Sequence, residues 1–335
     1  MKAWRFVDQF GFENLRFVEL PDPEPGPGQA VVRLRACSLN YRDLVLAQGG
    51  YGRAVKLPIT PLSDGAGEVI SVGPGVLRVK PGDRVCGIFM QRWLEGGPDD
   101  EKAASALGGA LDGMLAEQVC LNAEGLVHFP RYLSFEEAAT LPCAAVTAWN
   151  ALFHSGALRA GETVLVLGSG GVSVFALQFA KMAGARVIAT SSSDEKLERL
   201  RTMGADDTIN YRTNPDWDKA VRNLTDGVGV DHVIEVGGAG TLPLSIKSAR
   251  RGGHIALIGV LAGQGEMDPR PVLMKSIRLQ GIYVGSRAMF EEMNRALALA
   301  GVRPVVDRVF PLAEASAAMR HMLSGAHFGK ICIAF

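Results

Sequence analysis

The stretch GETVLVLGSGGVSVFALQFAKMAGARVIATSSSDEKLERLRTMGADDTINY, residues 161–211, contains the clearest structural pattern in the chain. Its apolar segment 163–167 is typical of a buried strand and runs directly into a glycine turn, 168–173. A helix with apolar residues at helical spacing follows and ends at Gly184, and 186–190 is a second apolar strand. A strand, a glycine turn, a helix and a strand within about thirty residues are the context of a dinucleotide-binding fingerprint.

The small residues of this turn have physical roles in such a site. Gly168 takes a tight turn that a side chain would oppose, and Gly170 lets the backbone approach a pyrophosphate at a helix N-terminus. The third position of the usual pattern, where glycine allows close helix–strand packing, is Ser173, which is also small. A glycine turn that binds nothing is the alternative. The predicted nucleotide-binding residues of the turn are Gly168, Ser169, Gly170, Gly171 and Val172.

Composition restricts the function classes. The chain of 335 residues is long enough for two domains, and 35 basic residues against 35 acidic residues give a net charge of zero. Without a basic excess, we expect neither nucleic-acid binding nor attachment to an anionic membrane surface. No apolar stretch reaches the roughly 18 residues that a membrane span needs.

The cysteines indicate a reducing environment. All five lie singly, without a CxxC pair, so the spacing indicates neither a disulfide framework nor a structural zinc site. The first residues, MKAWRFVDQF, lack the apolar segment of a secretory signal peptide. We therefore expect a cytoplasmic protein.

The first 125 residues are rich in strand signals. Short segments with alternating or apolar patterns are separated by Gly/Pro turns, which favours a partly closed barrel or sandwich. The predicted strands here are 1–7, 29–37, 67–72, 83–89 and 115–121.

The remainder alternates between strands and helices. Ser134 and Glu137 form a capping pattern for a buried helix. Together with the two strands of the opening stretch, four more apolar strands would complete a six-stranded doubly wound sheet. These four are 208–210, 230–236, 254–259 and 279–284. After a helix at 290–300, the last strand, 330–335, is expected to return to the N-terminal domain.

The whole chain, in order, resembles the medium-chain dehydrogenase/reductase superfamily. The matching motifs are RACSLN at 35–40, TPLSDGAG at 60–67 and the turn 168–172. The resemblance implies an α/β protein with a GroES-like, β-rich catalytic domain and a Rossmann NAD(P)-binding domain that contains a doubly wound, parallel six-stranded sheet. The implied boundaries are 1–125 with 287–335 for the catalytic domain and 126–286 for the Rossmann domain.

The zinc ligands of the superfamily's alcohol dehydrogenases are not matched. Those enzymes have a cysteine where Asn40 stands and a His-Glu pair where Ser63 and Asp64 stand, and only Cys143 falls at the third ligand position. Asparagine and serine are poor zinc ligands, and 91–113 lacks the cysteines of the structural zinc lobe. The chain is therefore similar to the zinc-independent quinone oxidoreductase branch, with no metal expected. We interpret Cys143 as a small buried hydrophobic residue.

The end of the second Rossmann strand favours NADP(H) over NAD(H). NAD-preferring members have an acidic residue there, whereas this chain has Ser191. The residues that match 2′-phosphate positions of NADPH-dependent quinone oxidoreductases are Ser191, Ser192, Lys196 and Tyr211. NAD remains open because no arginine directly follows the serines and Glu195 is close enough to bind a free ribose hydroxyl. Lys196 would then belong to a solvated helix face.

Further cofactor contacts are implied by position in the superfamily. They lie on the buried helix or at the carboxyl ends of strands, where such sheets bind ligands, although each would also fit as an ordinary strand-end residue. These residues are Thr147, Gly237, Gly259, Val260, Leu261, Val284 and Gly285.

Without zinc, polar side chains near the substrate must support the chemistry. We select Asn40 to hydrogen-bond an oxyanion or the nicotinamide ribose, and Tyr51, which matches an active-site tyrosine of quinone oxidoreductases, to donate a proton or stack on a ring. Asp43 is a third candidate. Arg42 and Asp43 would alternatively form an internal salt bridge that shapes the loop.

Three hypotheses follow. The leading one is a zinc-independent reductase that transfers a hydride from NADPH to a quinone or an α,β-unsaturated carbonyl. The second is an NAD(P)-dependent alcohol dehydrogenase or ketone reductase without zinc, and the third is a non-enzymic cofactor-binding relative. As a partner besides the small-molecule substrate, we expect a second copy of the chain, joined along the exposed edge strand 279–284.

Overall fold

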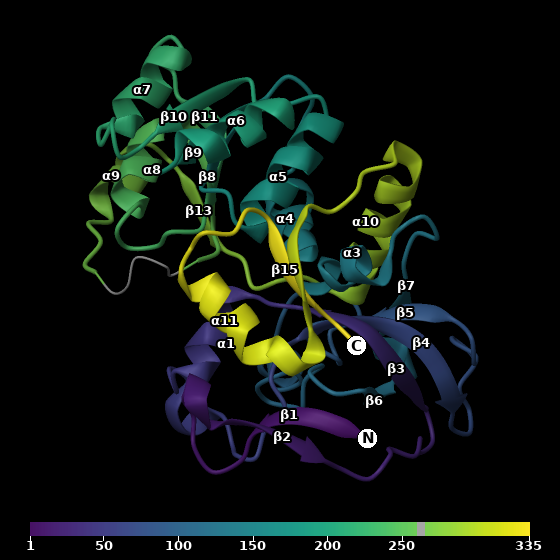
Figure 1. Cartoon of the computed structure of the whole chain (residues 1–335). Helices are drawn as coiled ribbons and strands as arrows, with labels where there is room; N and C mark the ends of the chain where they lie inside the picture. Colours follow the sequence, from purple (N-terminus) through teal and green to yellow (C-terminus); the bar gives the residue numbers. More distant parts are fainter. Residues whose placement is uncertain (260–264) are drawn as a thin grey trace. The chain divides into compact units, whose positions relative to one another are not determined.

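The computed structural model describes residues 1–259 and 265–335, and its contacts divide the chain into two units (Figure 1). The first unit consists of Met1–Val146 and Gly285–Phe335, and the second of Thr147–Val284. The predicted boundaries, after residues 125 and 286, differ from this division mainly by the segment 126–146. That segment lies in the first unit because α3 (Phe135–Ala139) packs against β3 (Gln29–Ser38) and β4 (Asp64–Val72).

The strands of the first unit are mainly antiparallel, with β14 and β15 paired in parallel. β1 (Lys2–Phe6) pairs with β2 (Leu15–Glu19), and within the described residues a seven-stranded sheet has the order β14-β15-β3-β4-β5-β7, with β6 also on β3. Its remaining strands are β5 (Arg84–Gly87), β6 (Gln118–Asn122), β7 (Leu126–His128), β14 (Val306–Pro311) and β15 (Lys330–Ala334). The helices are α1 (Tyr41–Ala47), α2 (Asp100–Ala103), α3, α10 (Arg287–Ala300) and α11 (Ala315–Leu323), with single 3₁₀ turns at Phe12–Asn14, Gly52–Ala54, Ala123–Gly125 and Leu312–Glu314.

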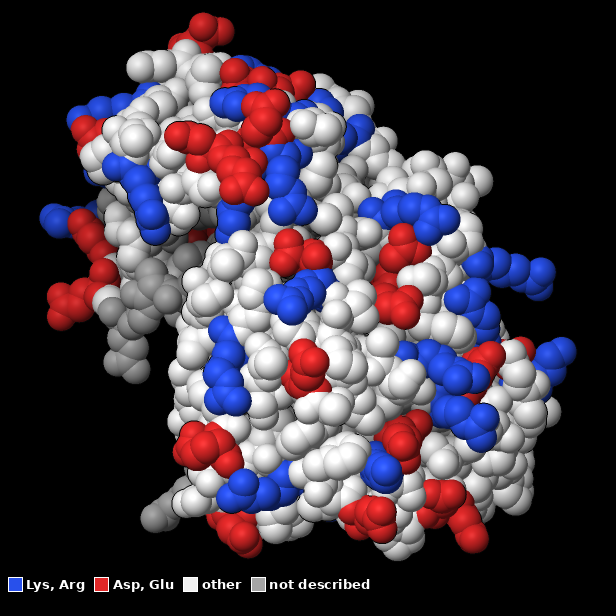
Figure 2. Space-filling model, in the orientation of Figure 1, with Lys and Arg blue, Asp and Glu red and all other residues white. Residues whose placement is uncertain are grey.

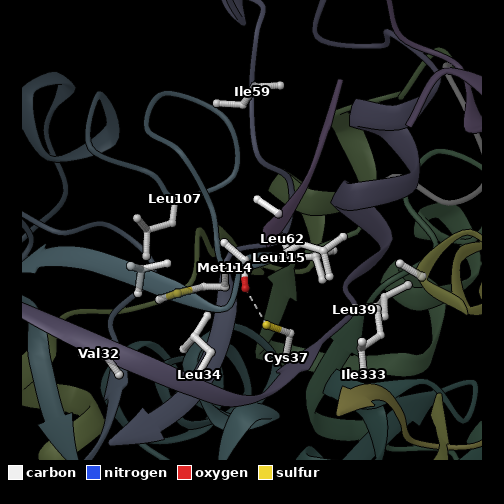
Figure 3. Packing of buried hydrophobic residues seen from close by; sticks show 14 of the residues in the cluster. Val32, Leu34, Cys37, Leu39, Ile59, Leu62, Leu107, Met114, Leu115 and Ile333 are labelled. Atoms are coloured by element: carbon white, nitrogen blue, oxygen red, sulfur yellow. Dashed lines mark hydrogen bonds between the residues drawn. The ribbon is translucent and has the colours of Figure 1, made fainter. Parts of the chain in front are cut away.

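Alternation along β3 explains how this unit forms its core. Val32 and Leu34 are buried while Arg33 and Arg35 between and beyond them are exposed, as expected of a strand with one face against the core. Figure 3 shows Val32 and Leu34 among leucine and methionine side chains from the loops. In the same core, the Cys37 thiol donates to the Met114 carbonyl oxygen at 2.7 Å.

The C-terminal strand returns to this unit, as the sequence predicted. β15 pairs antiparallel with the end of β3, with Cys332 opposite Ser38 and Ala334 opposite Ala36. Figure 1 shows the two strands side by side although nearly 300 residues separate them. This pairing brings Lys330 beside the residues that directly follow β3.

The second unit contains the predicted doubly wound sheet. In the described chain its six strands are all parallel and have the order β10-β9-β8-β11-β12-β13, which is the usual order of a dinucleotide-binding Rossmann sheet. The strands are β8 (Thr163–Leu167), β9 (Arg186–Ser191), β10 (Asp207–Asn210), β11 (Val230–Glu235), β12 (Ala249–Leu257) and β13 (Arg278–Gly281). The predicted fold class, a GroES-like domain with a Rossmann domain, is therefore confirmed.

Helices cover the sheet between consecutive strands. α5 and α6 pack against β8, β9 and β10, whereas α7 and α8 pack on one another and α8 lies against β11 and β12 (Figure 1). The helices are α5 (Gly171–Met182), α6 (Asp194–Thr202), α7 (Trp217–Leu224), α8 (Leu242–Ser248) and α9 (Arg270–Met274). The helical segment 141–155 crosses the division between the units as two π-helical turns, Leu141–Ala145 and Asn150–Ser155, on either side of α4 (Val146–Trp149).

Strand ends account for most differences from the sequence prediction. β12 begins at Ala249, five residues before the predicted start, because the polar residues Arg250 to Gly253 conceal the strand in a hydrophobicity pattern. β2, β7 and β14 were not predicted at all. They are short or have exposed side chains, so they lack a periodic apolar signal.

The surface is in keeping with a net charge of zero. Acidic and basic side chains are interspersed on the face shown in Figure 2. Among the described residues, no helix combines the length and apolar character required to cross a bilayer.

Candidate active site and cofactor site

Four buried polar side chains of the first unit form a chain of hydrogen bonds, which we call the Asn40 cluster (Asn40, Ser63, Asp64 and Lys330). The Lys330 ammonium donates to the Leu39 carbonyl oxygen and, at 2.6 Å, to Asn40 Oδ1. Asn40 Nδ2 lies 3.4 Å from Ser63 Oγ, which donates to Asp64 Oδ1 at 2.7 Å. None of the four is more than 8% exposed. Buried polar groups arranged in this way hold one another in a single geometry.

Asp64 ends this chain of hydrogen bonds. Its Oδ2 accepts the backbone N–H of Cys143 at 3.1 Å. Burial raises the pKa of the Asp64 carboxyl above its ordinary value, and the Lys330 ammonium opposes the rise. Lys330, a lysine in an apolar strand, is a residue of this cluster that sequence reasoning missed. The only local signal was its position at the start of the otherwise apolar segment KICIA.

Asp43 lies beside the cluster and fixes the start of α1. Its Oδ2 accepts the backbone N–H of Asn40 at 2.8 Å, in the manner of a capping box. The side chain is fully buried, and burial raises the pKa of Asp43 to about 6 while Arg42 opposes the rise. This geometry shows how Asp43 orients Asn40. Its predicted catalytic role stays a prediction.

Arg42 connects α1 to the neighbouring loop. Its guanidinium donates to the carbonyl oxygens of Leu107 and Gly108 at 2.8 and 3.2 Å. It lies 3.8 Å from Asp43 Oδ1 and 5.9 Å from the ring centroid of Tyr51. These contacts support the alternative interpretation that Arg42 shapes the loop. Tyr51 is 39% exposed, so this residue is partly accessible from solution.

The polar residues at the zinc-ligand positions do not fit zinc. Asn40 Oδ1 already accepts a hydrogen bond from the Lys330 ammonium, and the Ser63 hydroxyl donates to Asp64. Burial raises the pKa of the Cys143 thiol, which disfavours the thiolate form that binds zinc. In the part of the chain that the structure describes, no group of three His, Cys, Asp or Glu side chains is arranged to hold a metal ion.

The glycine turn of the second unit fits a nucleotide pyrophosphate. Gly168 has a φ of 74°, which favours glycine, and a β-carbon built at Gly168 or Gly170 would meet no atom within 4 Å. Gly170 is the N-cap of α5, and no side chain caps this end of the helix in the described structure. Open space in front of uncapped N–H groups is what an anion requires. Ser169 precedes the cap, and Gly171 and Val172 are the first residues of α5.

Ser173 explains how the turn does without its third glycine. The side chain is 1% exposed, and its hydroxyl donates to the Leu167 carbonyl oxygen at 2.6 Å. The hydroxyl therefore satisfies the last carbonyl of β8 while the residue remains small enough for close packing.

The predicted 2′-phosphate residues lie at the carboxyl ends of β9 and β10 and in the first turn of α6. Ser191 ends β9, and its carbonyl oxygen accepts the backbone N–H of Tyr211 at 3.1 Å. The Ser193 hydroxyl caps α6 through the N–H of Lys196, whose side chain is half-buried. Asp194, the acidic residue after the serines, accepts the Asn210 amide at 2.7 Å. Ser192 lies between Ser191 and the cap.

A buried glutamate organises the end of β11. Glu235 Oε1 accepts the N–H groups of Gly237 and Gly238 at 2.7 and 3.0 Å and the Thr241 hydroxyl at 2.5 Å. Its Oε2 accepts the Ser245 hydroxyl. Sequence reasoning selected Gly237 but missed Glu235, although an acidic residue that ends an apolar strand before two glycines was a usable signal.

The other predicted cofactor contacts are strand-end or helical residues. Gly259 donates to the Glu235 carbonyl oxygen at 3.2 Å, and Thr147 is buried in α4. Val284 has a φ of 59°, which is unusual for a β-branched residue, and its carbonyl oxygen accepts the Asn150 amide at 2.7 Å. A β-carbon at Gly285 would lie 2.6 Å from Val146 Cγ1, so only glycine fits. Val260 and Leu261 lie outside the described residues.

Family models match both parts of the chain. An alcohol dehydrogenase GroES-like domain matches residues 26–131, and a zinc-binding dehydrogenase domain matches residues 171–299. The chain is 46% identical to a zinc-type alcohol dehydrogenase-like protein of Schizosaccharomyces pombe, with 96% of each chain covered. It is 31% identical to a quinone oxidoreductase of Mus musculus, which covers 97% of this chain and 95% of that protein.

Solved structures of dehydrogenase-like proteins are also similar to this chain. A protein of Sinorhizobium meliloti 1021 described as a candidate alcohol dehydrogenase is 42% identical, with a TM-score of 0.93, over 100% of this chain and 98% of that one. An NAD-dependent alcohol dehydrogenase is 36% identical, with a TM-score of 0.92, over all of both chains. A mycobacterial protein complexed with NADPH is 28% identical, with a TM-score of 0.84, also over all of both chains.

The chain therefore belongs to the medium-chain dehydrogenase/reductase family, with its alcohol dehydrogenase-like and quinone oxidoreductase-like members. It is an oxidoreductase that uses a nicotinamide cofactor.

Proposed function

We propose that this oxidoreductase transfers a hydride from NADPH to a quinone or an α,β-unsaturated carbonyl compound and that it does so without zinc. The observation that carries the proposal is the Asn40 cluster. A buried ammonium group, that of Lys330, donates to Asn40 Oδ1, so a positive charge already lies beside Asn40 without a metal ion. The relative named a quinone oxidoreductase supports the substrate class.

The chain's own residues supply binding and proton delivery. NADPH, when bound, supplies the hydride. The Asn40 amide, oriented by Lys330 and Ser63, hydrogen-bonds an oxygen of the reactants, and the hydroxyl of the partly exposed Tyr51 delivers the proton that completes reduction of the acceptor. The N-terminus of α5 binds the pyrophosphate.

The 2′-phosphate of NADPH is assigned to Ser191, Ser192, Lys196 and Tyr211. Serine and tyrosine hydroxyls donate to a phosphate, and the nearest acid, Asp194, is engaged with Asn210. A carboxylate in place of Ser191 would repel the phosphate.

Nucleotide binding tests the cofactor assignment. The metal-stripped protein is titrated with NADPH and NADH while nucleotide fluorescence is followed. We expect tighter binding of NADPH and a loss of about tenfold with Lys196→Ala, because one charge-assisted hydrogen bond disappears. Lys219→Ala, which removes an exposed lysine of α7 paired with Asp216, is the control. Tighter binding of NADH would refute the assignment.

Turnover in EDTA tests the chemistry. We expect reduction of quinones or enones to continue at an unchanged rate when the chelator is present. Alcohol oxidation without turnover of either acceptor class would overturn the proposal.

A second candidate is an NAD-linked alcohol dehydrogenase or ketone reductase that works without zinc. It is favoured by the similar structure titled an NAD-dependent alcohol dehydrogenase and by Glu195, which is exposed in the first turn of α6, near the end of β9. Glu195→Gln should weaken NADH binding if this candidate is correct and leave NADPH binding unchanged if the first one is.

We further propose a homodimer joined along β13. This strand is an edge of the Rossmann sheet in the described chain, and Leu273, Met274 and Tyr283 around it are 77%, 68% and 52% exposed. Leu273→Glu should give monomers by light scattering, whereas Leu299→Glu, which changes a leucine 91% exposed on α10, should not. A dimer that survives Leu273→Glu would argue against this edge. Ile282→Pro would be a less specific test of the dimer than Leu273→Glu, because the Ile282 N–H donates to the Leu257 carbonyl oxygen within the sheet.

We also propose a cytoplasmic location. The five cysteines, all within the described residues, form no disulfide, which suits a reducing compartment. Recovery of the native protein in the soluble cytoplasmic fraction of its cell is the corresponding test.

A further inference from the structure

The second unit contains a hollow of about 540 Å³ at the amino ends of three strands. We call it the basic hollow (Arg222, Gly227, Val228, Arg250, Arg251 and Lys275). Gly227 and Val228 precede β11, Arg250 and Arg251 are the second and third residues of β12, and Lys275 precedes β13.

The basic hollow is separate from the nucleotide site. The sheet is parallel, so the amino ends of its strands all lie at one edge and the carboxyl ends at the other. Gly168 and Gly237 follow the carboxyl ends of β8 and β11, and Ser191 is the carboxyl end of β9. A ligand in the hollow is therefore at least one strand length away from the glycine turn.

The lining has an excess of positive charge. Four of its six residues are cationic, and within the described chain no acidic residue is among them. One cation is paired, since Arg250 Nε lies 2.5 Å from Asp231 Oδ1. The guanidinium groups of Arg222 and Arg251 instead donate to the carbonyl oxygens of Val228 and Met274, at 2.8 and 2.6 Å. These contacts fix the two side chains without neutralising them.

Lys275 is held in place by backbone oxygens. Its ammonium donates to the carbonyl oxygens of Ile246 and Lys247 at 2.8 and 3.0 Å and to that of Ala249. Burial and the neighbouring charges of Arg222 and Arg251 lower the pKa of Lys275 to about 8. The fold thus keeps like charges together at an energetic cost that a bound anion would offset.

We propose that the basic hollow binds a small molecule with two or more phosphate groups. Guanidinium groups match phosphate oxygens in a fork geometry, and each uses only part of its five donors here. The volume lies within the range of small-molecule sites and exceeds what a single phosphate ion fills. Binding at this place does not depend on which nicotinamide nucleotide the other edge of the sheet accepts.

Calorimetric titration of the full chain with inorganic pyrophosphate, in low salt and without nucleotide, tests this proposal. The variant Arg222→Gln/Arg251→Gln should bind at least about tenfold more weakly, because two charge-assisted contacts are lost. Arg16→Gln is the matched control, since Arg16 also donates only to a backbone carbonyl, that of Glu13 at 2.9 Å, in the first unit. Inorganic phosphate should bind more weakly than pyrophosphate.

Proton uptake provides a second readout that is specific to the hollow. The charged residues that line the hollow besides Lys275 are Arg222, Arg250 and Arg251. The elements around it also carry Asp218 and Lys219 of α7, Asp231 of β11, Lys247 of α8 and Arg270 of α9. An anion in the hollow favours the protonated amine, so pyrophosphate binding at pH 8 should take up protons, measured as a dependence of the heat on buffer ionisation enthalpy.

The possible outcomes are distinct. If pyrophosphate binds the double variant as tightly as the natural chain, it binds at the glycine turn and the proposal is overturned. The proposal is also overturned if pyrophosphate does not bind the natural chain, or if its binding takes up no protons. If the double variant does not fold by circular dichroism, Arg251→Lys replaces it. Arg251→Lys keeps the charge and removes the fork, so it should weaken binding severalfold while proton uptake remains. Equal affinity of Arg251→Lys and the natural chain would contradict recognition by the guanidinium.

Discussion

Lys330 Nζ lies 2.6 Å from Asn40 Oδ1, although the two residues are 290 positions apart in the chain. The lysine belongs to the last strand and is 3% exposed, and the asparagine follows β3 and is 8% exposed. This contact joins the C-terminal strand to the candidate catalytic residue. It places a positive charge beside Asn40 and near the carboxyl groups of Asp43 and Asp64. That charge opposes the rise that burial causes in the pKa of each of these two carboxyls.

Replacing Lys330 by methionine should destabilise the protein. The change leaves the Leu39 carbonyl oxygen and Asn40 Oδ1 without their donor and removes the charge that compensates buried carboxyls, at a cost of about 3 kcal/mol in the free energy of unfolding. Urea unfolding measures the effect, and Lys56→Met, at an exposed lysine, is the control. Equal stability of the two variants would show that the buried ammonium is dispensable.

Acid should weaken the second unit through His254. Its Nε2 lies 2.9 Å from Ser155 Oγ, and its Nδ1 lies 3.4 Å from His232 Nδ1. The other ring nitrogen of His232, Nε2, lies 3.0 Å from Glu162 Oε2. Burial and the charge of His232 lower the pKa of His254 to about 4 from 6.5. Between these values the unfolded chain binds the extra proton, so this part of the stability is complete above pH 6.5 and is lost as the pH falls toward 4.

Thermal unfolding at several pH values between 4.5 and 7 checks this. Carboxyl groups also titrate in acid, so the comparison is with His254→Gln, whose melting temperature should change less over the same range. If the natural chain and the variant give parallel curves, His254 is not the group responsible.

Gly259→Ala should be strongly destabilising. A β-carbon at Gly259 would lie 1.8 Å from the Val236 carbonyl oxygen, so the backbone at the ends of β11 and β12 would have to move. Overpacking of this kind costs about 1–3 kcal/mol. Gly281→Ala, where a β-carbon would meet no atom within 4 Å, should unfold at the same urea concentration as the natural chain. A similar loss in both variants would contradict the steric explanation.

Ser173→Ala should lower the free energy of unfolding by about 1 kcal/mol, because the Leu167 carbonyl oxygen loses its donor. Ser173→Gly restores the usual glycine pattern but should cost about 1 kcal/mol more, since glycine is unfavourable inside a helix. Chemical denaturation distinguishes the three forms. A glycine variant as stable as the natural chain would show that the hydroxyl adds nothing.

The site was predictable where its geometry is local. The glycine turn and Ser191 at the end of β9 depend on a few consecutive residues, and the described structure has the turn before α5 and Ser191 as the last residue of β9. The partners of Asn40 and the ligands of Glu235 were not predictable in this way. Nothing near Asn40 in the sequence indicates Lys330, and the donors to Glu235 depend on how the loop after β11 folds back.

By itself, the sequence determined the class of fold and the glycine turn between β8 and α5, because apolar periodicity and glycine turns are set by neighbouring residues. Only the tertiary structure decided which buried polar groups meet. The Asn40 cluster requires β15 to pair with the end of β3, and the basic hollow requires α7, β12 and the segment before β13 to converge. A buried charge is stable only beside its partners, and those partners come from distant segments that the sheet order brings together.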